Sequence, residues 1–280
     1  MGDTLILGGD GMLGRTLSRR WNDALALGRA QVDLTRPATI STALAAQRPR
    51  IVVNCAAMTA VDACESDRER AFAVNALGAG NLAAACAESG ATLIHISTDY
   101  VFPGDLDRPY REDDATGPRT VYGQSKLAGE SAVRERCPAH LIARIAWLYG
   151  PGGPSFVHTM AKLAGQSGAA LNVVDDQRGN PTSTDAVADH LALLIGRGIH
   201  GTVHLSCEGE TTWFGFAREI LSWRGSKRGV QPCTTAQFPR PAPRPANSSL
   251  DKIVLRSHDL PPMPHWRDAF AAFTRTWPDG

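Results

Sequence analysis

A tyrosine and a lysine four residues apart, Tyr122 and Lys126, are the side chains of this sequence best suited to proton transfer. Residues four apart lie on one face of a helix. A lysine ammonium near a phenol favours the phenolate and lowers the pKa of the tyrosine from about 10. Tyr122 would then give a proton to a carbonyl oxygen that receives hydride, while Lys126 also holds the ribose of a nicotinamide cofactor. The spacing alone fits a solvent-exposed Tyr/Lys pair equally well. The neighbouring motifs decide whether the pair is catalytic.

A threonine at the end of an expected strand supplies a third group. Residues 92–102 form an apolar run with its exit loop, which carries Thr98, Asp99 and Tyr100. In a doubly wound sheet, the carboxyl ends of the strands face the ligand crevice. We expect Thr98 to hydrogen-bond the same substrate oxygen as Tyr122 and to polarise it.

Three glycines near the N-terminus, Gly8, Gly11 and Gly14, follow a short apolar run and open a helical segment. Such a turn brings backbone N–H groups and the positive end of a helix to a pyrophosphate. The alternative is an ordinary glycine-rich turn. The strand before these glycines and the helix after them favour a dinucleotide site.

The second strand is expected to end near the adenosine ribose, where an NAD-selective site often carries an acid. This chain has Gly28 and Arg29 there. A guanidinium can pair with a 2′-phosphate, so Arg29 favours NADPH, with NADH left possible. Asp33 and Leu34 follow, placed to meet the adenine or to cap a turn.

Strand-like and helix-like segments alternate through the first half of the chain. We expect strands at residues 5–8, 24–27, 50–57, 92–102, 140–149, 171–174 and 202–206, and helices at residues 12–21, 68–89 and 121–136. This alternation predicts an α/β fold with a Rossmann-type doubly wound parallel sheet. Residues 1–150 are expected to form an NAD(P)-binding Rossmann domain. Residues 151–280 would form a smaller, partly discontinuous C-terminal substrate domain, with some segments returning to the first domain.

The composition is that of an ordinary globular protein, with 43% hydrophobic and 20% charged residues. A formal net charge of +1 argues against nucleic acid or an anionic membrane as a partner. No apolar stretch is long enough to span a bilayer, and the N-terminus lacks the features of a signal peptide. The six cysteines show no paired spacing, so we expect neither a metal site nor disulfides, and a cytoplasmic location.

The sequence resembles the dTDP-4-dehydrorhamnose reductase family of the extended short-chain dehydrogenase/reductase superfamily over nearly its full length. The matching blocks are residues 53–62, 74–76, 97–102, 122–130, 146–150, 174–182 and 244–250. The resemblance implies a cofactor site and a substrate site. The cofactor residues would be Gly11, Met12 and Leu13 at the pyrophosphate turn, Asp33, Leu34, Ala56, Ala57 and Met58 on the adenine and ribose side, and Tyr122 and Lys126 at the nicotinamide ribose. The sugar would face Thr98, Asp99 and Trp147, although a tryptophan also suits core packing.

Two positions refine the expected activity. The related nucleotide-sugar 4,6-dehydratases carry a Glu after the Thr-Asp pair, where this chain has Tyr100. The resemblance therefore favours reduction of an existing ketone over elimination of water. The chain also has Ile145 and Ala146 where the family usually has Thr and Ser, which could alter contacts with the sugar.

Two arginines, Arg178 and Arg244, are candidates for binding the substrate diphosphate, because guanidinium groups pair well with phosphates; structural salt bridges are the alternative. The proline-rich segment 240–245 resembles a polyproline ligand for an SH3-type partner, but we favour a rigid loop over the substrate. The acidic segment 112–114 is expected to be a solvated loop.

These observations predict NADPH-dependent reduction of the 4-keto group of dTDP-4-dehydro-6-deoxy-L-mannose (dTDP-4-dehydro-β-L-rhamnose) to dTDP-L-rhamnose, with Tyr122, Lys126 and Thr98 as catalytic residues. One alternative is the reduction of another nucleotide-linked 4-keto-deoxysugar. A second is a non-catalytic NADP-binding regulatory subunit of the same fold. The resemblance also allows a homodimer and Mg²⁺, for which no ligands can be mapped.

Overall fold

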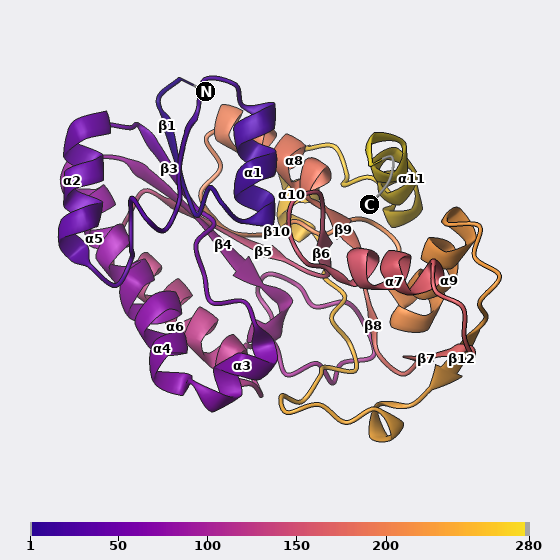
Figure 1. Ribbon diagram of the computed structural model, residues 1–280. Coiled ribbons are helices and arrows are strands. Elements are labelled where there is room, and N and C mark those ends of the chain that lie inside the picture. Colours follow the sequence, from indigo (N-terminus) through magenta and orange to yellow (C-terminus); the bar gives the residue numbers. More distant parts are fainter. Residues whose placement is uncertain (1, 278–280) are drawn as a thin grey trace.

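The computed structural model describes residues 2–277 and is built around a six-stranded sheet with the order β10-β5-β4-β3-β1-β2 (Figure 1). The strands are β1 (Thr4–Leu7), β2 (Leu25–Leu27), β3 (Ile51–Asn54), β4 (Thr92–Thr98), β5 (His140–Ile145) and β10 (Gly201–His204). All neighbouring strands of this sheet pair in parallel. The prediction of a Rossmann-type doubly wound sheet is confirmed.

Helices cover both faces of the sheet. The helices α2 (Pro37–Gln47), α5 (Ala79–Ser89) and α6 (Val121–Arg136) lie on one side, and α1 (Met12–Arg20) and α8 (Thr184–Gly196) on the other (Figure 1). The alternating side chains of strand β1 show why both faces need helices, because both are apolar. Leu5 and Leu7 join the core beneath α2 and α5, whereas Ile6 joins the core shared with α1 and α8. A strand buried on both faces reads as a continuous apolar run.

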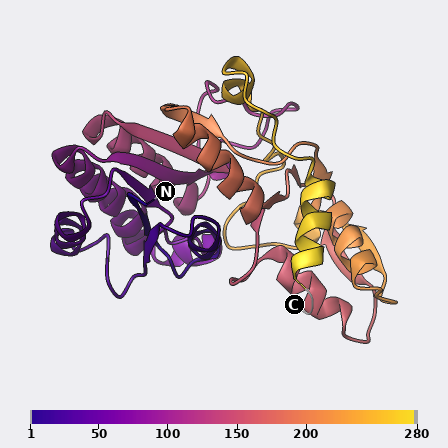
Figure 2. The same ribbon diagram turned by 90° about the horizontal axis from the view of Figure 1, so that it is seen from above.

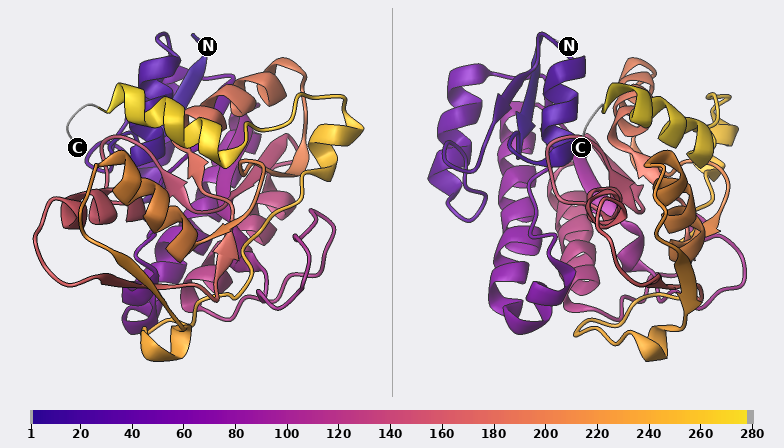
Figure 3. Two further views of the ribbon diagram at one scale, coloured as in Figure 1. Left: turned by 90° about the vertical axis from the view of Figure 1, so that its right-hand side faces the viewer. Right: turned by 45° about the vertical axis from the view of Figure 1, so that its right-hand side comes forward.

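The second half of the chain forms short strand pairs and helices beside the sheet (Figures 2 and 3). The pairs are β7 (Leu171–Val174) with β12 (Val230–Cys233), β8 (Arg178–Gly179) with β11 (Thr211–Thr212), and β6 (Leu148–Tyr149) with β9 (Thr182–Ser183). Their helices are α7 (Phe156–Ala164), α9 (Trp213–Trp223), α10 (Ile253–Ser257) and α11 (Trp266–Thr276). Strand β10 and helix α8 belong to the main sheet and its cover. The domain boundary near residue 150 stays a prediction.

The strand expected over residues 140–149 is interrupted. Strand β5 ends at Ile145, and β6 begins at Leu148. Between them Trp147 has a φ of +47°, a left-handed conformation that ends the strand ladder. The prediction of one continuous strand is therefore wrong, because Trp147 lies in a break between β5 and β6.

The helix expected over residues 68–89 is present but not uniform. It comprises α4 (Arg68–Phe72), a π-helical turn (Ala73–Gly78) and α5, and it follows the short helix α3 (Val61–Ser66). Asn75 lies in the π turn, where its side chain accepts a hydrogen bond from Met58 N and donates to Met58 O. The wider turn thus connects this helix to the loop after β3.

The segment 112–114 is a loop in which Asp113 is exposed, as expected, but Glu112 is not solvated. The Glu112 carboxylate is more than half buried and accepts hydrogen bonds from the backbone N–H groups of His204, Ile253 and Val254. Burial raises the pKa of this carboxyl. Glu112 is therefore a structural acceptor that joins β10 to the start of α10.

No helix among residues 2–277 is long and apolar enough to cross a membrane.

A buried ion pair fixes α6 against the sheet. The Glu130 carboxylate of α6 receives two hydrogen bonds from Arg144 of β5, at 2.9 and 2.8 Å, and one from Ser97 of β4, at 2.6 Å. Both charged side chains are almost fully buried, and the cations beside Glu130 contribute to holding the pKa of its carboxyl below its usual value. Arg144 therefore depends on Glu130 as its partner, whereas Glu130 also pairs with the partly exposed Arg134 at 2.7 Å.

We expect Glu130→Ala to lower the free energy of unfolding by about 3–5 kcal/mol, because it leaves Arg144 buried and unpaired. Urea denaturation measures the loss. Glu219 pairs with Arg267 at the surface, so Glu219→Ala is a matched control with an effect of at most about 1 kcal/mol. Equal losses in the two variants would contradict the assigned importance of the buried pair.

Candidate active site

The glycine turn after β1 has the geometry that a dinucleotide pyrophosphate requires. Gly8 has a φ of +76°, and a Cβ there would lie 2.6 Å from the backbone nitrogen of Ala56. A Cβ on Gly14 would lie 2.3 Å from the carbonyl oxygen of Gly8. Gly11 precedes α1 and offers no side-chain cap to its first N–H groups, and that first turn contains no acidic residue. The cradle therefore fits an anionic phosphate group at the helix N-terminus.

A cavity of about 270 Å³ extends from this turn across the ends of β2 and β3. Its lining contains the residues predicted for the adenine and ribose side of the cofactor, together with two glycines of the pyrophosphate turn: Arg29, Asp33, Leu34, Ala56, Ala57 and Met58, with Gly8 and Gly11. The exposed Arg29 has its Nε 3.6 Å from an Asp33 oxygen. Hydrogen bonds from Thr35 hold the pKa of Asp33 below its usual value. Asp33 therefore both caps a turn and lines the cavity.

A second cavity, of about 390 Å³, shares Gly11, Cys55 and Ala57 with the first. It brings together the other predicted residues of the centre: Met12, Leu13, Thr98, Asp99, Tyr122, Lys126 and Trp147. The three proposed catalytic side chains thus meet where the dinucleotide cavity continues past the glycine turn. Gly14 lines neither cavity, because it serves the close packing of the turn.

The start of α6 sets the position of Tyr122. The Thr120 hydroxyl accepts a hydrogen bond of 3.0 Å from Gly123 N and caps the helix. Glu65 of α3 accepts another from Val121 N at 2.8 Å. A Cβ on Gly123 would lie 2.2 Å from the carbonyl oxygen of Tyr100, so a glycine is needed where the helix meets the end of β4.

Tyr122 is protonated in this environment. Burial raises the pKa of its phenol, and a hydrogen bond with Thr98 opposes that shift only in part. The groups that shift this pKa do not include Lys126, so the lowering expected from the Tyr122–Lys126 spacing stays a prediction. The Nζ atom of Lys126 instead lies 2.6 Å from the carbonyl oxygen of Ile96 and 3.2 Å from His95 Nε2. A protonated phenol suits a proton donor rather than a base.

Asp99 also lines the second cavity. Its Oδ1 accepts a hydrogen bond from the Thr98 hydroxyl at 2.9 Å, and Ser248 lies close enough to lower the pKa of the carboxyl, but the buried Oδ2 has no hydrogen bond of good geometry. Burial raises the pKa of this carboxyl to about 6. A buried acceptor without a partner is costly, which suits Asp99 to a ligand hydroxyl.

Trp147 forms one wall of the second cavity. Its indole stacks on Trp213 of α9, with ring centroids 3.5 Å apart and an interplanar angle of 6°. On its edge lies Gly179 of β8. Trp213 was not predicted from the sequence; its position directly after Thr211 and Thr212 gives no signal, because only the fold brings it to Trp147.

A third cavity, of about 640 Å³, adjoins the second at Tyr100 and at the Trp147–Trp213 pair. Its wall is largely apolar and aromatic, and it includes Arg244 and Arg240 from the proline-rich segment. Arg244 also pairs with Asp62 at 2.9 Å. The segment thus lies against α3 and contributes to a cavity, as a rigid loop would.

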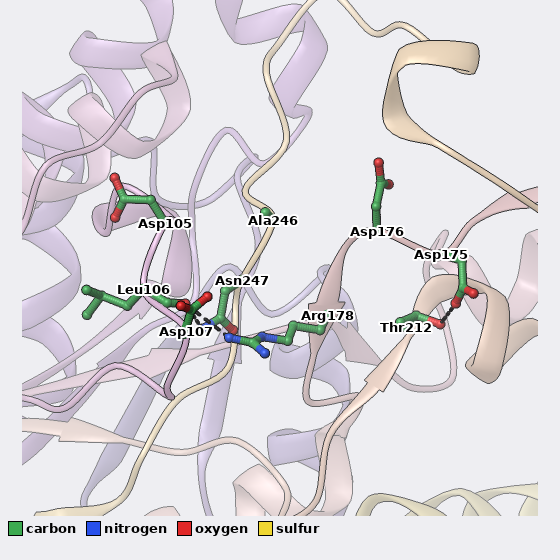
Figure 4. Close-up of a pocket in the computed structure, with 10 residues that line it drawn as sticks. Asp105, Leu106, Asp107, Asp175, Asp176, Arg178, Thr212, Ala246 and Asn247 are labelled. Atoms are coloured by element: carbon green, nitrogen blue, oxygen red, sulfur yellow. Dashed lines mark hydrogen bonds between the residues drawn. The ribbon is translucent and has the colours of Figure 1, made fainter.

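Arg178 lies elsewhere. It extends from β8 toward the 105–107 loop, where its guanidinium donates to the carbonyl oxygen of Leu106 (Figure 4). The cavity that it lines contains four aspartates: Asp105, Asp107, Asp175 and Asp176. So many carboxylates disfavour a diphosphate at this place, and the arrangement does not support a joint role for Arg178 and Arg244.

Among residues 2–277, no group of three or more His, Cys, Asp or Glu side chains is arranged to hold a metal ion. The structure therefore assigns no ligands to the Mg²⁺ that the family resemblance allows.

The parallel sheet, the glycine turn and the Thr98–Tyr122–Lys126 cavity define a Rossmann-fold oxidoreductase of the short-chain dehydrogenase type. The profile of the family described as RmlD substrate binding domain matches residues 2–277, and the chain belongs to this family.

Individual relatives match over almost the whole chain. A dTDP-4-dehydrorhamnose reductase of Streptomyces griseus is 47% identical over 285 residues, covering 98% of this chain and 92% of the relative. A probable dTDP-4,6-dihydroxy-2-methyloxan-3-one 4-ketoreductase of Streptomyces antibioticus is 46% identical, covering 95% and 92%. A crystal structure of dTDP-4-dehydrorhamnose reductase from Bacillus anthracis in complex with NADP superposes with a TM-score of 0.95 at 36% identity, covering 98% of each chain. The predicted family resemblance is confirmed.

We expect Gly179→Ala to disturb the indole pair, because a Cβ would lie 2.5 Å from Cε2 of Trp147. Overpacking of this kind costs about 1–3 kcal/mol, and separation of the two rings would weaken their coupled near-ultraviolet circular dichroism. Gly196 has open space around it, so Gly196→Ala is the matched control that leaves the spectrum unchanged. An unaltered spectrum in Gly179→Ala would refute the assigned contact.

Proposed function

We propose that this protein reduces the 4-keto group of dTDP-4-dehydro-β-L-rhamnose with NADPH and forms dTDP-L-rhamnose. The observation that carries the proposal is the meeting of Thr98, Tyr122 and Lys126 in one cavity that continues into the glycine-turn cavity. Membership of the family, and relatives named as reductases of this ketone, support the choice of substrate.

Each residue of the cavity has a separate role in the proposed reaction. Bound NADPH supplies the hydride to the ketone carbon. Tyr122, which burial keeps protonated, donates its phenolic proton to the oxygen that gains negative charge. Thr98 hydrogen-bonds that oxygen, and Lys126 in its charged form stabilises the phenolate left behind. Asp99 accepts a hydrogen bond from a sugar hydroxyl through its free Oδ2.

The third cavity is suited to the nucleotide end of the substrate. Its aromatic side chains Phe156, Trp213 and Phe238 offer stacking surfaces for a base. Arg240 and Arg244 offer guanidinium groups for the diphosphate. The stacked Trp147–Trp213 pair separates this cavity from the sugar site, so the substrate would reach across it.

A second candidate substrate is another dTDP-linked 4-keto-deoxysugar. It is favoured by the Streptomyces antibioticus relative, whose name specifies a 4-ketoreductase of a different sugar at nearly the same identity. Comparing kcat/KM for the two ketones separates these candidates. A regulatory subunit without turnover is disfavoured by the complete Thr98–Tyr122–Lys126 set.

A cytoplasmic location suits this proposal, because all six cysteines are free and four are buried as small core residues. A homodimer stays a prediction.

Tyr122→Phe is expected to lower kcat by about 10²–10⁴-fold, because the proton donor is lost while the ring remains. The decrease in nicotinamide absorbance with dTDP-4-dehydro-β-L-rhamnose measures the rate. Tyr149 is a buried tyrosine whose hydroxyl has no protein partner, so Tyr149→Phe is the matched control. Full activity in Tyr122→Phe, or no turnover of this ketone by the unaltered protein, would overturn the proposal.

Arg29→Ala is expected to weaken NADPH binding about tenfold, by removing a charge-assisted hydrogen bond to the 2′-phosphate, and to leave NADH binding unchanged. Titration of nicotinamide fluorescence gives both dissociation constants. Arg36 is exposed and lines none of the three cavities, so Arg36→Ala serves as the control. Equal loss for NADPH and NADH would exclude Arg29 as the basis of a cofactor preference.

A further inference from the structure

A line of three buried polar side chains runs from β3 through β4 to the catalytic helix. Asn54 and His95 are directly paired in the sheet, and Asn54 Nδ2 lies 3.1 Å from His95 Nδ1. The other ring nitrogen, Nε2, lies 3.2 Å from Lys126 Nζ. All three residues are almost fully buried, so water does not replace these contacts.

The backbone determines where the hydrogen atoms of this line lie. Asn54 Oδ1 accepts a hydrogen bond of 3.1 Å from the N–H of Ala56, which identifies it as the oxygen. The Asn54 amide nitrogen therefore faces His95 and donates to Nδ1. Because a neutral imidazole carries one hydrogen, that hydrogen must be on Nε2. Burial and the nearby cations lower the pKa of His95 well below its usual value, which keeps the ring neutral.

An N–H group on His95 thus points at the Lys126 amine. An ammonium has only donors, so it would face this N–H donor to donor, whereas a neutral amine accepts the hydrogen bond and still donates to the Ile96 carbonyl oxygen at 2.6 Å. We propose that His95, oriented by Asn54, is a positioning residue that holds Lys126 Nζ at the Ile96 carbonyl and favours its neutral form. The consequence for the rate rests on the proposed reduction.

Other groups around the Lys126 amine raise or lower its pKa. Burial lowers the pKa of Lys126 to about 8, while the Glu130 carboxylate opposes this shift. Tyr122 lies on the same helix as Lys126 and lines the same cavity. The Arg134 cation helps to lower the pKa of His95. The fraction of charged Lys126 therefore changes near neutral pH. In this range the position of the hydrogen atom on His95 alters how much of Lys126 is charged.

The consequence for catalysis follows from the sign of the shift. The charged lysine, which stabilises the Tyr122 phenolate, is present below the pKa of Lys126 and is lost as the pH rises through about 8. We expect kcat to fall over the same range. A change that removes the His95 N–H from Lys126 should raise the pKa of Lys126 and move this fall to higher pH.

Asn54→Asp tests the position of the ring hydrogen, because it keeps the shape and the acceptor for Ala56 N–H. The added carboxylate also raises the pKa of Lys126 by charge alone, so the uncharged His95→Gln variant decides the pKa effect. The second oxygen of the carboxylate would accept a hydrogen bond from Nδ1, so the ring hydrogen moves to Nδ1 and Nε2 becomes an acceptor for the ammonium. ¹⁵N spectra of histidine-labelled protein identify the protonated ring nitrogen, and ¹³C shifts of labelled lysine give the pKa of Lys126. We expect Nε2–H in the unaltered protein, Nδ1–H in Asn54→Asp, and a rise in the pKa of Lys126 by about one unit.

His95→Gln is the second variant, which adds no charge and also serves if Asn54→Asp does not fold. Its amide oxygen can face the ammonium, so the pKa of Lys126 and the fall in kcat should again move upward. His190 is also buried but contacts backbone carbonyls of residues 186, 261 and 262, so His190→Gln is the control that leaves both unchanged.

The spectra separate this proposal from the proposed function, because they need no substrate. Nδ1–H in the unaltered protein, or a pKa of Lys126 that is the same in His95→Gln as in the unaltered protein, would overturn the role of His95. The expected spectra without turnover of the ketone would instead overturn the proposed reaction and leave the role of His95 in place.

Discussion

Helix α6 is attached to strand β4 by two sets of buried polar contacts, and the geometry of the site depends on them. Near the middle of the helix, Glu130 binds Ser97 and Arg144; one turn earlier, Lys126 binds the Ile96 carbonyl oxygen. Both sets involve charges or polar groups without access to water, so a shift of the helix along the strand would leave them unpaired at a cost of several kcal/mol. Tyr122, one further turn toward the N-terminus, is therefore held beside Thr98 at the end of β4.

The same burial that orders these groups sets their protonation. It raises the pKa values of Tyr122 and Asp99 and lowers that of Lys126, so each group is displaced toward its neutral form. The phenol remains a proton donor, and the carboxyl and the amine titrate nearer to neutral pH. Tyr122 as proton donor, Asp99 as hydrogen-bond acceptor and Lys126 as cation can thus share one cavity. Each can exist there in a neutral form, which needs less solvation than a permanent charge.

Local features of the sequence predicted those parts of the site that depend on local geometry. The three glycines, the strand end at Thr98 and the helical spacing of Tyr122 and Lys126 each express a backbone requirement within a few residues, and α6 has the bounds expected from its sequence. The pairing of Trp147 with Trp213 and the approach of Asp105 and Asp107 to Arg178 were not predictable in this way. Each joins segments far apart in the chain that only the tertiary fold brings together. His95 was missed for another reason: in an apolar strand, its residue type gives no indication that its neighbour in the adjacent strand is Asn54.

Ile145 and Ala146, where the family resemblance leads us to expect hydroxyl side chains, occupy two different environments in the fold. Ala146 is 1% exposed and packs in a core cluster with Phe102 and Tyr110, so the loss of a hydroxyl there affects packing and not the ligand. Ile145 is the register partner of Thr98 and lines the catalytic cavity. An apolar side chain beside the threonine that polarises the ketone offers no hydrogen bond, so whatever lies against it in the complex must be an apolar surface of the cofactor or of the sugar. Ile145 therefore acts directly at the cavity beside Thr98, whereas Ala146 acts through the packing of the core cluster on which Trp147 lies.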